Sequence, residues 1–185
     1  MQSEERINEM SGKILLINVD RCVGCYACEV ACKQENDLSI KSTWCRPIPI
    51  GPRQIGGEFH LDFVPTVCIH CEEPICSYFC QFDAIKKRKD GIVMISEENC
   101  TGCGLCVSGC PYGAIYLDDK KSLAGKCCLC ASRIDDGLEP SCVQHCLSGA
   151  LQFVPEDELA EAIQGRNIAK NGKVFYLSDK WKLSL

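Results

Sequence analysis

Residues 100–110 read CTGCGLCVSGC, which is the pattern C-x2-C-x2-C-x3-C. Three related quartets occur elsewhere in the 185 residues, so that most of the 18 cysteines of the chain fall in quartets. The quartets are Cys22, Cys25, Cys28 and Cys32; Cys68, Cys71, Cys76 and Cys80; Cys100, Cys103, Cys106 and Cys110; and Cys127, Cys130, Cys142 and Cys146. In C-x2-C-x2-C the backbone can curl around a cubane so that three thiolates bind one cluster, while the fourth cysteine ligates a neighbouring cluster. The spacing therefore predicts iron–sulfur ligands and a role in electron transfer.

The position of the fourth cysteine of each quartet predicts that the clusters lie in neighbouring pairs. Four residues of helix advance about 6 Å, so with thiolates reaching from both ends the two clusters should lie on the order of 10 Å apart. The segment between the second and third quartets reads as two strands, 84–87 and 92–95, around a turn at Asp90-Gly91. This pattern is typical of a β-hairpin. It favours pairing of the second quartet with the third, and hence of the first with the fourth.

The outer quartets are flanked by apolar segments, 14–19 before Cys22 and 150–154 after Cys146. We expect these two strands to close on each other. The fold class expected is α+β, with two interlocked bacterial ferredoxin-like modules of short β-hairpins and short helices around cubane clusters. The predicted boundaries are 13–32 with 120–154 for the outer module, 33–60 for a connecting or partner-binding loop, 61–119 for the inner module, and 155–185 for a C-terminal tail.

The two segments outside the modules are candidates for partner contact. The connecting segment contains Trp44 and several prolines and glycines, which is too irregular for a packed helix. The tail is predicted to hold a short helix over 156–163, an apolar extended run over 174–177, and Trp181. Such an apolar run suits either an interface with another protein or packing on the protein's own core.

Composition and charge restrict the class of partner. The formal charge is −5, and sixteen thiolates with four oxidised cluster cores would make it about −13, which disfavours nucleic acid. No run approaches the roughly 18 apolar residues that would cross a bilayer. Residues 1–11 are charged and polar and do not resemble an apolar signal segment. We therefore expect a cytoplasmic protein, exported only if a signal-bearing partner carries it.

Other uses of cysteine fit the pattern less well. Zinc takes four-cysteine sites from paired C-x2-C elements, but it needs neither a third cysteine at x2 nor a fourth at x3. A disulfide scaffold would call for an oxidising compartment, which the polar N-terminal residues do not indicate. A zinc-stabilised interaction module remains an alternative that metal analysis decides.

Five further residues near the quartets need an interpretation. Cys127 forms C-x2-C with Cys130 whereas Cys128 does not, so Cys127 is the expected ligand; Cys45 is expected to be a packed thiol. His70 and His145 each stand next to a quartet cysteine, and we expect their N–H groups to touch sulfur and shift a reduction potential. His60 is expected at the surface.

The basic run 86–89, KKRK, lies at the predicted tip of the hairpin between the second and third quartets. It is interpreted as a solvated turn, with docking of an acidic partner as the alternative.

Three motifs carry a resemblance to a known family. They are PTVCIHCEEPIC over 65–76, the third quartet with PYGA over 111–114, and KCCLC over 126–130 with Arg133, Gly137, Leu138, Pro140 and Cys142. Over about residues 13–154 the chain resembles the four-cluster electron-transfer subunits of molybdopterin and tungstopterin oxidoreductases, of the dimethyl sulfoxide reductase type. It is also similar to the small polyferredoxin subunits of tungsten aldehyde oxidoreductases and benzoyl-CoA reductases.

The resemblance implies four 4Fe–4S clusters and a residue-by-residue assignment of ligands. Site one would use Cys22, Cys25, Cys28 and Cys146; site two Cys32, Cys127, Cys130 and Cys142; site three Cys68, Cys71, Cys76 and Cys110; and site four Cys80, Cys100, Cys103 and Cys106. It also implies a non-catalytic subunit that relays single electrons to or from a larger subunit carrying a molybdenum or tungsten pterin, with a further redox subunit as an additional partner. The alternatives are an electron-transfer component of a hydrogenase or carbon monoxide dehydrogenase system, and a free polyferredoxin carrier.

Overall fold

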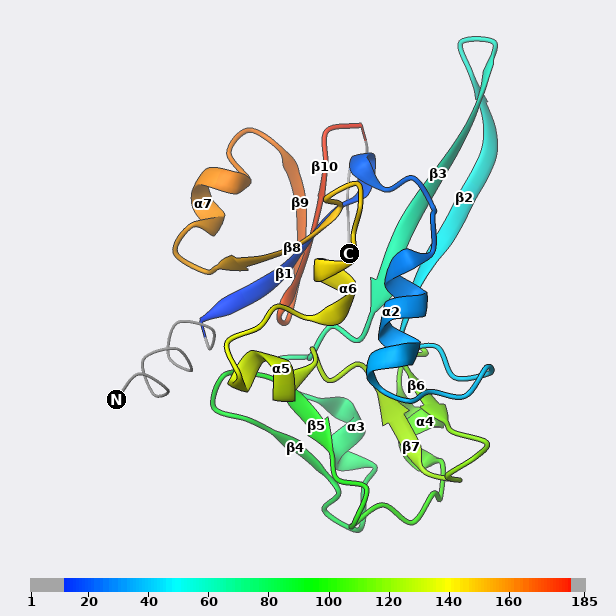
Figure 1. Cartoon of the computed structure of the whole chain (residues 1–185), viewed down its shortest axis with the longest axis vertical. Helices are drawn as coiled ribbons and strands as arrows, with labels where there is room; N and C mark the ends of the chain where they lie inside the picture. The colour runs from blue at the N-terminus through cyan, green and yellow to red at the C-terminus, as the bar shows by residue number, and fades with distance from the viewer. Residues whose placement is uncertain (1–11, 181–185) are drawn as a thin grey trace.

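The computed structural model describes residues 12–180, in which short strands and short helices are mixed (Figure 1). Its largest sheet has four strands in the order β8-β1-β10-β9. The strands are β8 (Leu151–Pro155), β1 (Lys13–Asn18), β10 (Val174–Ser178) and β9 (Asn167–Asn171). Strand β1 runs antiparallel to β8, as expected from the two apolar segments that flank the outer quartets, and parallel to β10.

Strand β1 is buried on both faces because two layers of the molecule cover it. Side chains alternate along a strand, so Leu15 and Ile17 pack into the cysteine-containing core while Ile14 and Leu16 face the opposite side. On that opposite side the strand packs against Leu159 of helix α7 (Leu159–Ala162). The 3-10 turn η1 (Val19–Arg21) then leads from β1 into the first quartet.

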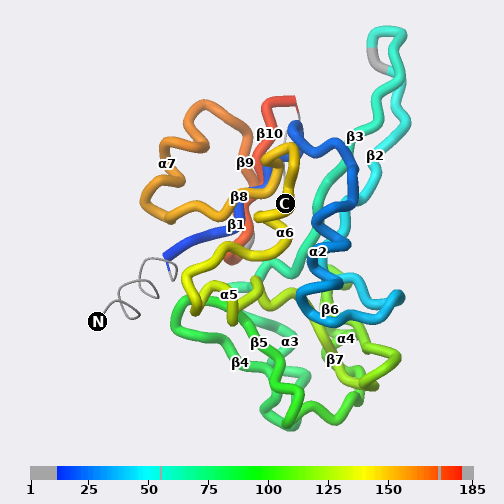
Figure 2. The backbone as a smooth tube through the Cα atoms, viewed as in Figure 1, coloured from blue at the N-terminus to red at the C-terminus, as the bar shows by residue number. Residues whose placement is uncertain are grey.

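The connecting segment that was expected to be an irregular loop is mainly a long β-hairpin. Strands β2 (Cys45–Ile55) and β3 (Glu58–Val67) pair antiparallel and project from the body (Figures 1 and 2). Gly56 and Gly57, both with positive φ, form its two-residue turn, which suits the twist of paired strands. Prolines fit here because a two-stranded ribbon consists only of edge strands.

The second and third quartets lie around two small hairpins. The predicted hairpin around Asp90-Gly91 is confirmed as β4 (Ile85–Lys87) and β5 (Val93–Ile95), and β6 (Ile115–Leu117) pairs with β7 (Ala124–Lys126). Ala124 packs in the same core as Ile85. The predicted boundary between residues 119 and 120 therefore falls inside one hairpin, and the boundary between 60 and 61 falls inside β3.

The tail packs on the protein's own core. The predicted apolar run is β10, whose Val174, Phe175 and Leu177 are buried, and the predicted helix is reduced to the single turn α7. Trp181 lies outside the described residues. The longest helix of the described part is α2 (Ala27–Glu35) with nine residues, and none there could span a membrane.

Candidate metal centres

The first two cysteines of every quartet lie on a loop of the same backbone conformation. In all four loops the residue just before the second cysteine has a left-handed φ, between 50° and 68°. These residues are Gly24, His70, Gly102 and Leu129. Glycine adopts this conformation freely, whereas a residue with a Cβ is strained there. The repeated turn explains why the four loops present their thiols in a similar way although their sequences differ.

The third cysteine of every quartet is the second residue of a short helix. The helices are α2 with Cys28, α3 (Ile75–Tyr78) with Cys76, α4 (Leu105–Gly109) with Cys106, and α6 (Ser141–Gln144) with Cys142. The fourth cysteine follows four residues later, at or beyond the helix end except in the longer α2. Each helix therefore carries one cysteine toward the site of its own loop and directs the next cysteine toward a neighbouring site.

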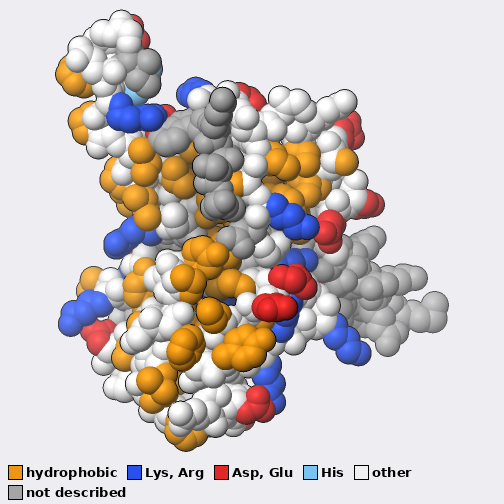
Figure 3. All heavy atoms as spheres, turned by 180° about the vertical axis from the view of Figure 1, so that it is seen from behind, with side chains coloured by type: hydrophobic (Ala, Val, Ile, Leu, Met, Phe, Trp, Pro, Cys, Tyr) orange, Lys and Arg blue, Asp and Glu red, His pale blue; other side chains and the backbone are white. Residues whose placement is uncertain are grey.

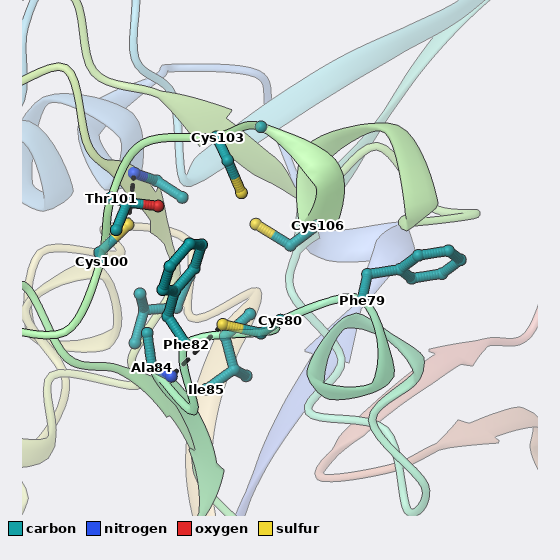
Figure 4. Close-up of a pocket in the computed structure, with 12 residues that line it drawn as sticks. Phe79, Cys80, Phe82, Ala84, Ile85, Cys100, Thr101, Cys103 and Cys106 are labelled. Atoms are coloured by element: carbon teal, nitrogen blue, oxygen red, sulfur yellow. Dashed lines mark hydrogen bonds between the residues drawn. The ribbon is translucent and has the colours of Figure 1, made fainter.

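The four cysteines of site four surround one hollow (Figure 4). The sulfur atoms of Cys80, Cys100, Cys103 and Cys106 turn toward a common space, with the ring of Phe82 beside them. The hollow has a volume of about 320 Å³, part of which is open to solvent. Apart from the cysteines its lining is largely apolar, as in Ile85, Ile95 and Ala124.

Site three has the same arrangement around a second hollow of about 360 Å³, again partly open to solvent. Its cysteines are Cys68, Cys71, Cys76 and Cys110. Three side chains with polar groups line this hollow in addition to apolar residues: His70 and Lys126, which are buried, and Tyr112, which is exposed. The two hollows therefore hold equivalent sets of cysteines in different electrostatic surroundings.

At sites one and two, neighbouring cysteine thiols affect one another's pKa. Burial raises the pKa of the Cys22 thiol, and the neighbouring Cys28, Cys146 and Cys25 thiols raise it further. Burial likewise raises the pKa of Cys32, together with Cys142 and Cys130, and that of Cys127, together with Cys32 and Cys142. Cys128 and Cys28 also raise the pKa of Cys32, so the pKa shifts show that the grouped cysteines lie close together without singling them out as ligands. Helix α2 contacts α6 and thereby joins the first and last quartets.

Backbone N–H groups donate to the fourth cysteine in three of the quartets. The amide of Ala84 lies 3.3 Å from Cys80 Sγ, that of Ala114 lies 3.4 Å from Cys110 Sγ, and that of Leu151 lies 3.3 Å from Cys146 Sγ. Each donor lies four or five residues after its cysteine, at or just before the strand that follows the quartet. In the first quartet the side-chain amide of Asn36 takes this role, 3.7 Å from Cys32 Sγ. Such donors stabilise sulfur that carries negative charge.

The donor set fits 4Fe–4S clusters chemically. Burial raises the pKa of Cys76 to about 11 and that of Cys130 to about 12, so these thiols need a bound cationic core to exist as thiolates at neutral pH. Within residues 12–180 no three Cys, His, Asp or Glu side chains converge closely enough for a single metal ion. The cysteines of sites three and four instead surround hollows of several hundred Å³.

The two cysteines outside the quartets have different environments. Cys128 directs its thiol to Asn36 Oδ1 at 3.5 Å, which agrees with Cys127 as the ligand. Cys45 is buried, as expected, and the neighbouring Cys142 and Cys28 thiols raise its pKa well above the usual value, as does burial. Cys45 in turn lowers the pKa of Cys28. The position of Cys45 depends on the pairing of β2 with β3, and this pairing was not expected from the sequence.

The three histidines also differ. The His70 side chain is buried and accepts the Val93 backbone N–H at Nδ1, over 2.9 Å. Burial, and then the nearby Lys126 and Lys173, hold the pKa of His70 well below its usual value. His145 is exposed, with Nδ1 2.9 Å from the Ser141 carbonyl oxygen, and His60 is exposed as predicted.

The basic run at the β4–β5 hairpin is largely paired within the chain. Lys86 contacts Asp83, Lys87 contacts Glu72, and Arg88 forms two hydrogen bonds with Asp135. These contacts favour the interpretation as a turn over that of an open docking point.

The chain is similar to known iron–sulfur proteins. Residues 59–156 match the family model described as a 4Fe-4S dicluster domain. The chain is 37% identical over 150 residues to a chain of the anaerobic dimethyl sulfoxide reductase of Escherichia coli (strain K12), covering 77% of this chain and 73% of that one. It is 34% identical over 167 residues to the iron-sulfur subunit of the nitrate-inducible formate dehydrogenase of the same organism, covering 82% and 57%. A tetrathionate reductase subunit of Salmonella typhimurium (strain LT2) is 34% identical over 143 residues, covering 74% and 55%.

Proposed function

The chain belongs to the 4Fe-4S dicluster family of iron–sulfur subunits, and from this premise we propose that it relays single electrons through four clusters to or from a larger catalytic subunit. The observation that carries this proposal is the convergence of the cysteines from different quartets around shared spaces. Relatives named as chains of dimethyl sulfoxide, formate and tetrathionate enzymes support the same role.

We assign the cluster ligands as the four cysteines of each of sites one to four. When bound, a 4Fe–4S cluster accepts and releases one electron. The cysteines of this chain would hold the core, backbone amides such as that of Ala84 donate to sulfur, and the Phe82 ring lies beside the cysteines of site four. These are the groups through which a protein adjusts the potential of a cluster.

The four sites form a continuous series. Helix α2 joins sites one and two through Cys28 and Cys32, and α4 joins sites three and four through Cys106 and Cys110. Sites two and three approach each other where Cys68 lies near Cys127 and raises its pKa, although burial is the larger cause. Electrons therefore have a path from site one to site four in which each step crosses one helix or one close contact.

The two ends of this series lie near the surface. Cys25 of site one and Cys103 of site four are exposed, whereas most other ligands are buried or half-buried. A redox partner that docks at either end can thus come close to a cluster. The two interlocked modules expected from the sequence correspond, in this proposal, to sites one with two and sites three with four.

Exposed apolar side chains support a permanent protein partner. Ile75, Tyr78, Phe79, Phe82 and Tyr112 are exposed around sites three and four. Figure 3 shows apolar side chains spread over this lower part of the molecule. Such surface is unusual for a freely diffusing carrier, so it favours a subunit over a free polyferredoxin. We propose that the partner is a larger subunit with a molybdenum or tungsten pterin, as the resemblance implies. The cytoplasmic location stays a prediction.

Anaerobic purification of the chain from its native cells tests the assignment to a complex. We expect a larger chain to co-purify in equal amount, and to contain molybdenum or tungsten by elemental analysis. Reduction of the clusters in this complex by the substrate of the large chain would show that the relay is connected. A chain that purifies alone, with all four clusters and no partner even at low salt, would instead indicate a free carrier.

A further inference from the structure

The unusual residue of site three is a histidine in a position that favours glycine. His70 has φ 51° just before the second cysteine of its loop, where the first and third quartets have Gly24 and Gly102. A side chain in this conformation is strained, and strain that persists in a structure is often linked to a functional role. Leu129, at the same place in the fourth quartet, is a buried apolar residue, whereas His70 places a polar ring there.

The ring of His70 has one satisfied and one unsatisfied nitrogen. Nδ1 accepts the Val93 N–H, so the proton of the neutral imidazole resides on Nε2. The side chain is only 1% exposed, and Nε2 has no hydrogen-bond partner among the described residues. A buried N–H donor without an acceptor is rare. His70 lines the hollow of site three, so a cluster bound there would offer sulfur atoms as acceptors for this N–H.

A buried lysine lines the same hollow. Lys126 is 3% exposed, and its Nζ donates to the Val93 carbonyl and, over 3.0 Å, to the Cys127 carbonyl. Both acceptors are neutral, so its positive charge is not balanced by them. Val93 thus fixes both groups, since its N–H binds His70 and its carbonyl binds Lys126.

Site four is different although its loop and helix are built in the same way. Among the described residues that line it, Thr101 is the only polar side chain apart from the cysteines. The residue that corresponds to His70 is Gly102, which has no side chain to donate. The buried polar groups of site three, which are the imidazole N–H and the ammonium group, therefore have no counterpart among the residues that line site four.

We propose that His70 and Lys126 hold the cluster of site three at a higher reduction potential than the cluster of site four. This inference rests on the proposed function. One electron passes from a neighbouring cluster to that of site three, which lowers the formal charge of one iron by one and makes or breaks no bond. A donor N–H at sulfur and a nearby cation both favour the more negative, reduced state. Site three would then be the step of the relay at which an electron resides longer.

The test is an EPR-monitored redox titration of the anaerobic holoprotein and of variants at the two proposed residues, with further variants that assign the signals and serve as a control. His70→Leu removes the N–H donor and introduces leucine, which is the residue found at the equivalent position of the fourth quartet as Leu129. Lys126→Gln removes the charge but keeps a donor, and Lys126→Arg keeps the charge. Cys71→Ser and Cys103→Ser identify the signals of sites three and four, because each changes one cluster.

In the wild-type protein the midpoint of site three should lie above that of site four. His70→Leu and Lys126→Gln should each lower the midpoint of site three alone. At a fixed solution potential the ratio of reduced to oxidised cluster should fall about tenfold, which is ~59 mV for one electron. Lys126→Arg should keep most of the wild-type value. His145→Leu is the matched control, since His145 also adjoins a ligand cysteine but is exposed, and it should leave site three unchanged.

A second measurement needs no variant of His70 or Lys126. In wild-type protein with ¹⁵N-labelled histidine, pulsed EPR should show a nitrogen coupling on the signal of site three. The inference is overturned if this coupling is absent, or if His70→Leu and Lys126→Gln retain full iron content with an unchanged midpoint. Absence of clusters from the wild-type protein would overturn the proposed function itself.

Discussion

Replacement of Gly102 by alanine tests the shared loop geometry of the cluster sites. Gly102 has φ 68°, and a Cβ built there would fall well inside contact distance of the Ser122 carbonyl oxygen. Because the obstructing atom belongs to the backbone, a side-chain rotation cannot relieve the overlap. The loop that carries Cys100 and Cys103 must then move away from the segment that leads into β7.

The size of the effect has two contributions. An L-residue in the left-handed region costs roughly 1–2 kcal/mol. Overpacking that forces backbone shifts adds about 1–3 kcal/mol. Gly113→Ala is the matched control, because Gly113 has φ 59° but nothing lies within 4 Å of the position that its methyl group would take. The control therefore carries the conformational strain without the overlap.

The assay is thermal unfolding of the anaerobic holoprotein at one scan rate, with iron content measured before heating. For a chain of this size, 1 kcal/mol corresponds to roughly 2–4 °C in the midpoint. Gly102→Ala should therefore unfold roughly 2–12 °C below Gly113→Ala, from the overlap contribution alone. Its site four should also release iron first. Equal midpoints and equal iron content for the two variants would refute the reasoning about this loop.

Three further predictions concern the core, the unused thiols and the metal. Phe175 lies buried in β10, so Phe175→Ala should lower the free energy of unfolding by about 3–5 kcal/mol. Phe59→Ala on the exposed hairpin should change it by less than about 0.5 kcal/mol. A similar loss for both variants would contradict the described core. Cys45→Ser and Cys128→Ser should keep full iron content, unlike Cys127→Ser, and iron loss in Cys128→Ser would reverse the choice of ligand. Removal of iron by an oxidant and a chelator should abolish the cooperative unfolding transition, because the proposed ligand cysteines form much of the core. An unchanged transition would show that the fold does not need the clusters.

The sequence predicted the parts of the structure that depend on local spacing. The cysteine quartets, the turn at Asp90-Gly91 and the strands next to the outer quartets each follow from neighbouring residues. The parallel pairing of β1 with β10 does not, because the two strands are far apart in the chain. The apolar run 174–177 showed that a strand exists there, but it gave no information about which surface covers it.

Two features of the structure differ in how far the sequence indicates them. Gly56-Gly57 is a hairpin signal between β2 and β3, but the prolines of these strands are more typical of an irregular segment. The joint contact of His70 and Lys126 with Val93 depends on three segments that meet only in the folded chain. Lys126 in the sequence is simply a residue before a cysteine, so its burial was not foreseen.

The central claim is that the four groups of cysteines hold four 4Fe–4S clusters. Quantification of iron and acid-labile sulfide per chain in anaerobically prepared protein, combined with EPR of the reduced state, tests it most directly. We predict about sixteen irons and about sixteen sulfides per chain, with signals from interacting one-electron centres. Protein that contains mainly zinc, or only about four irons and no interacting signals, would contradict the account.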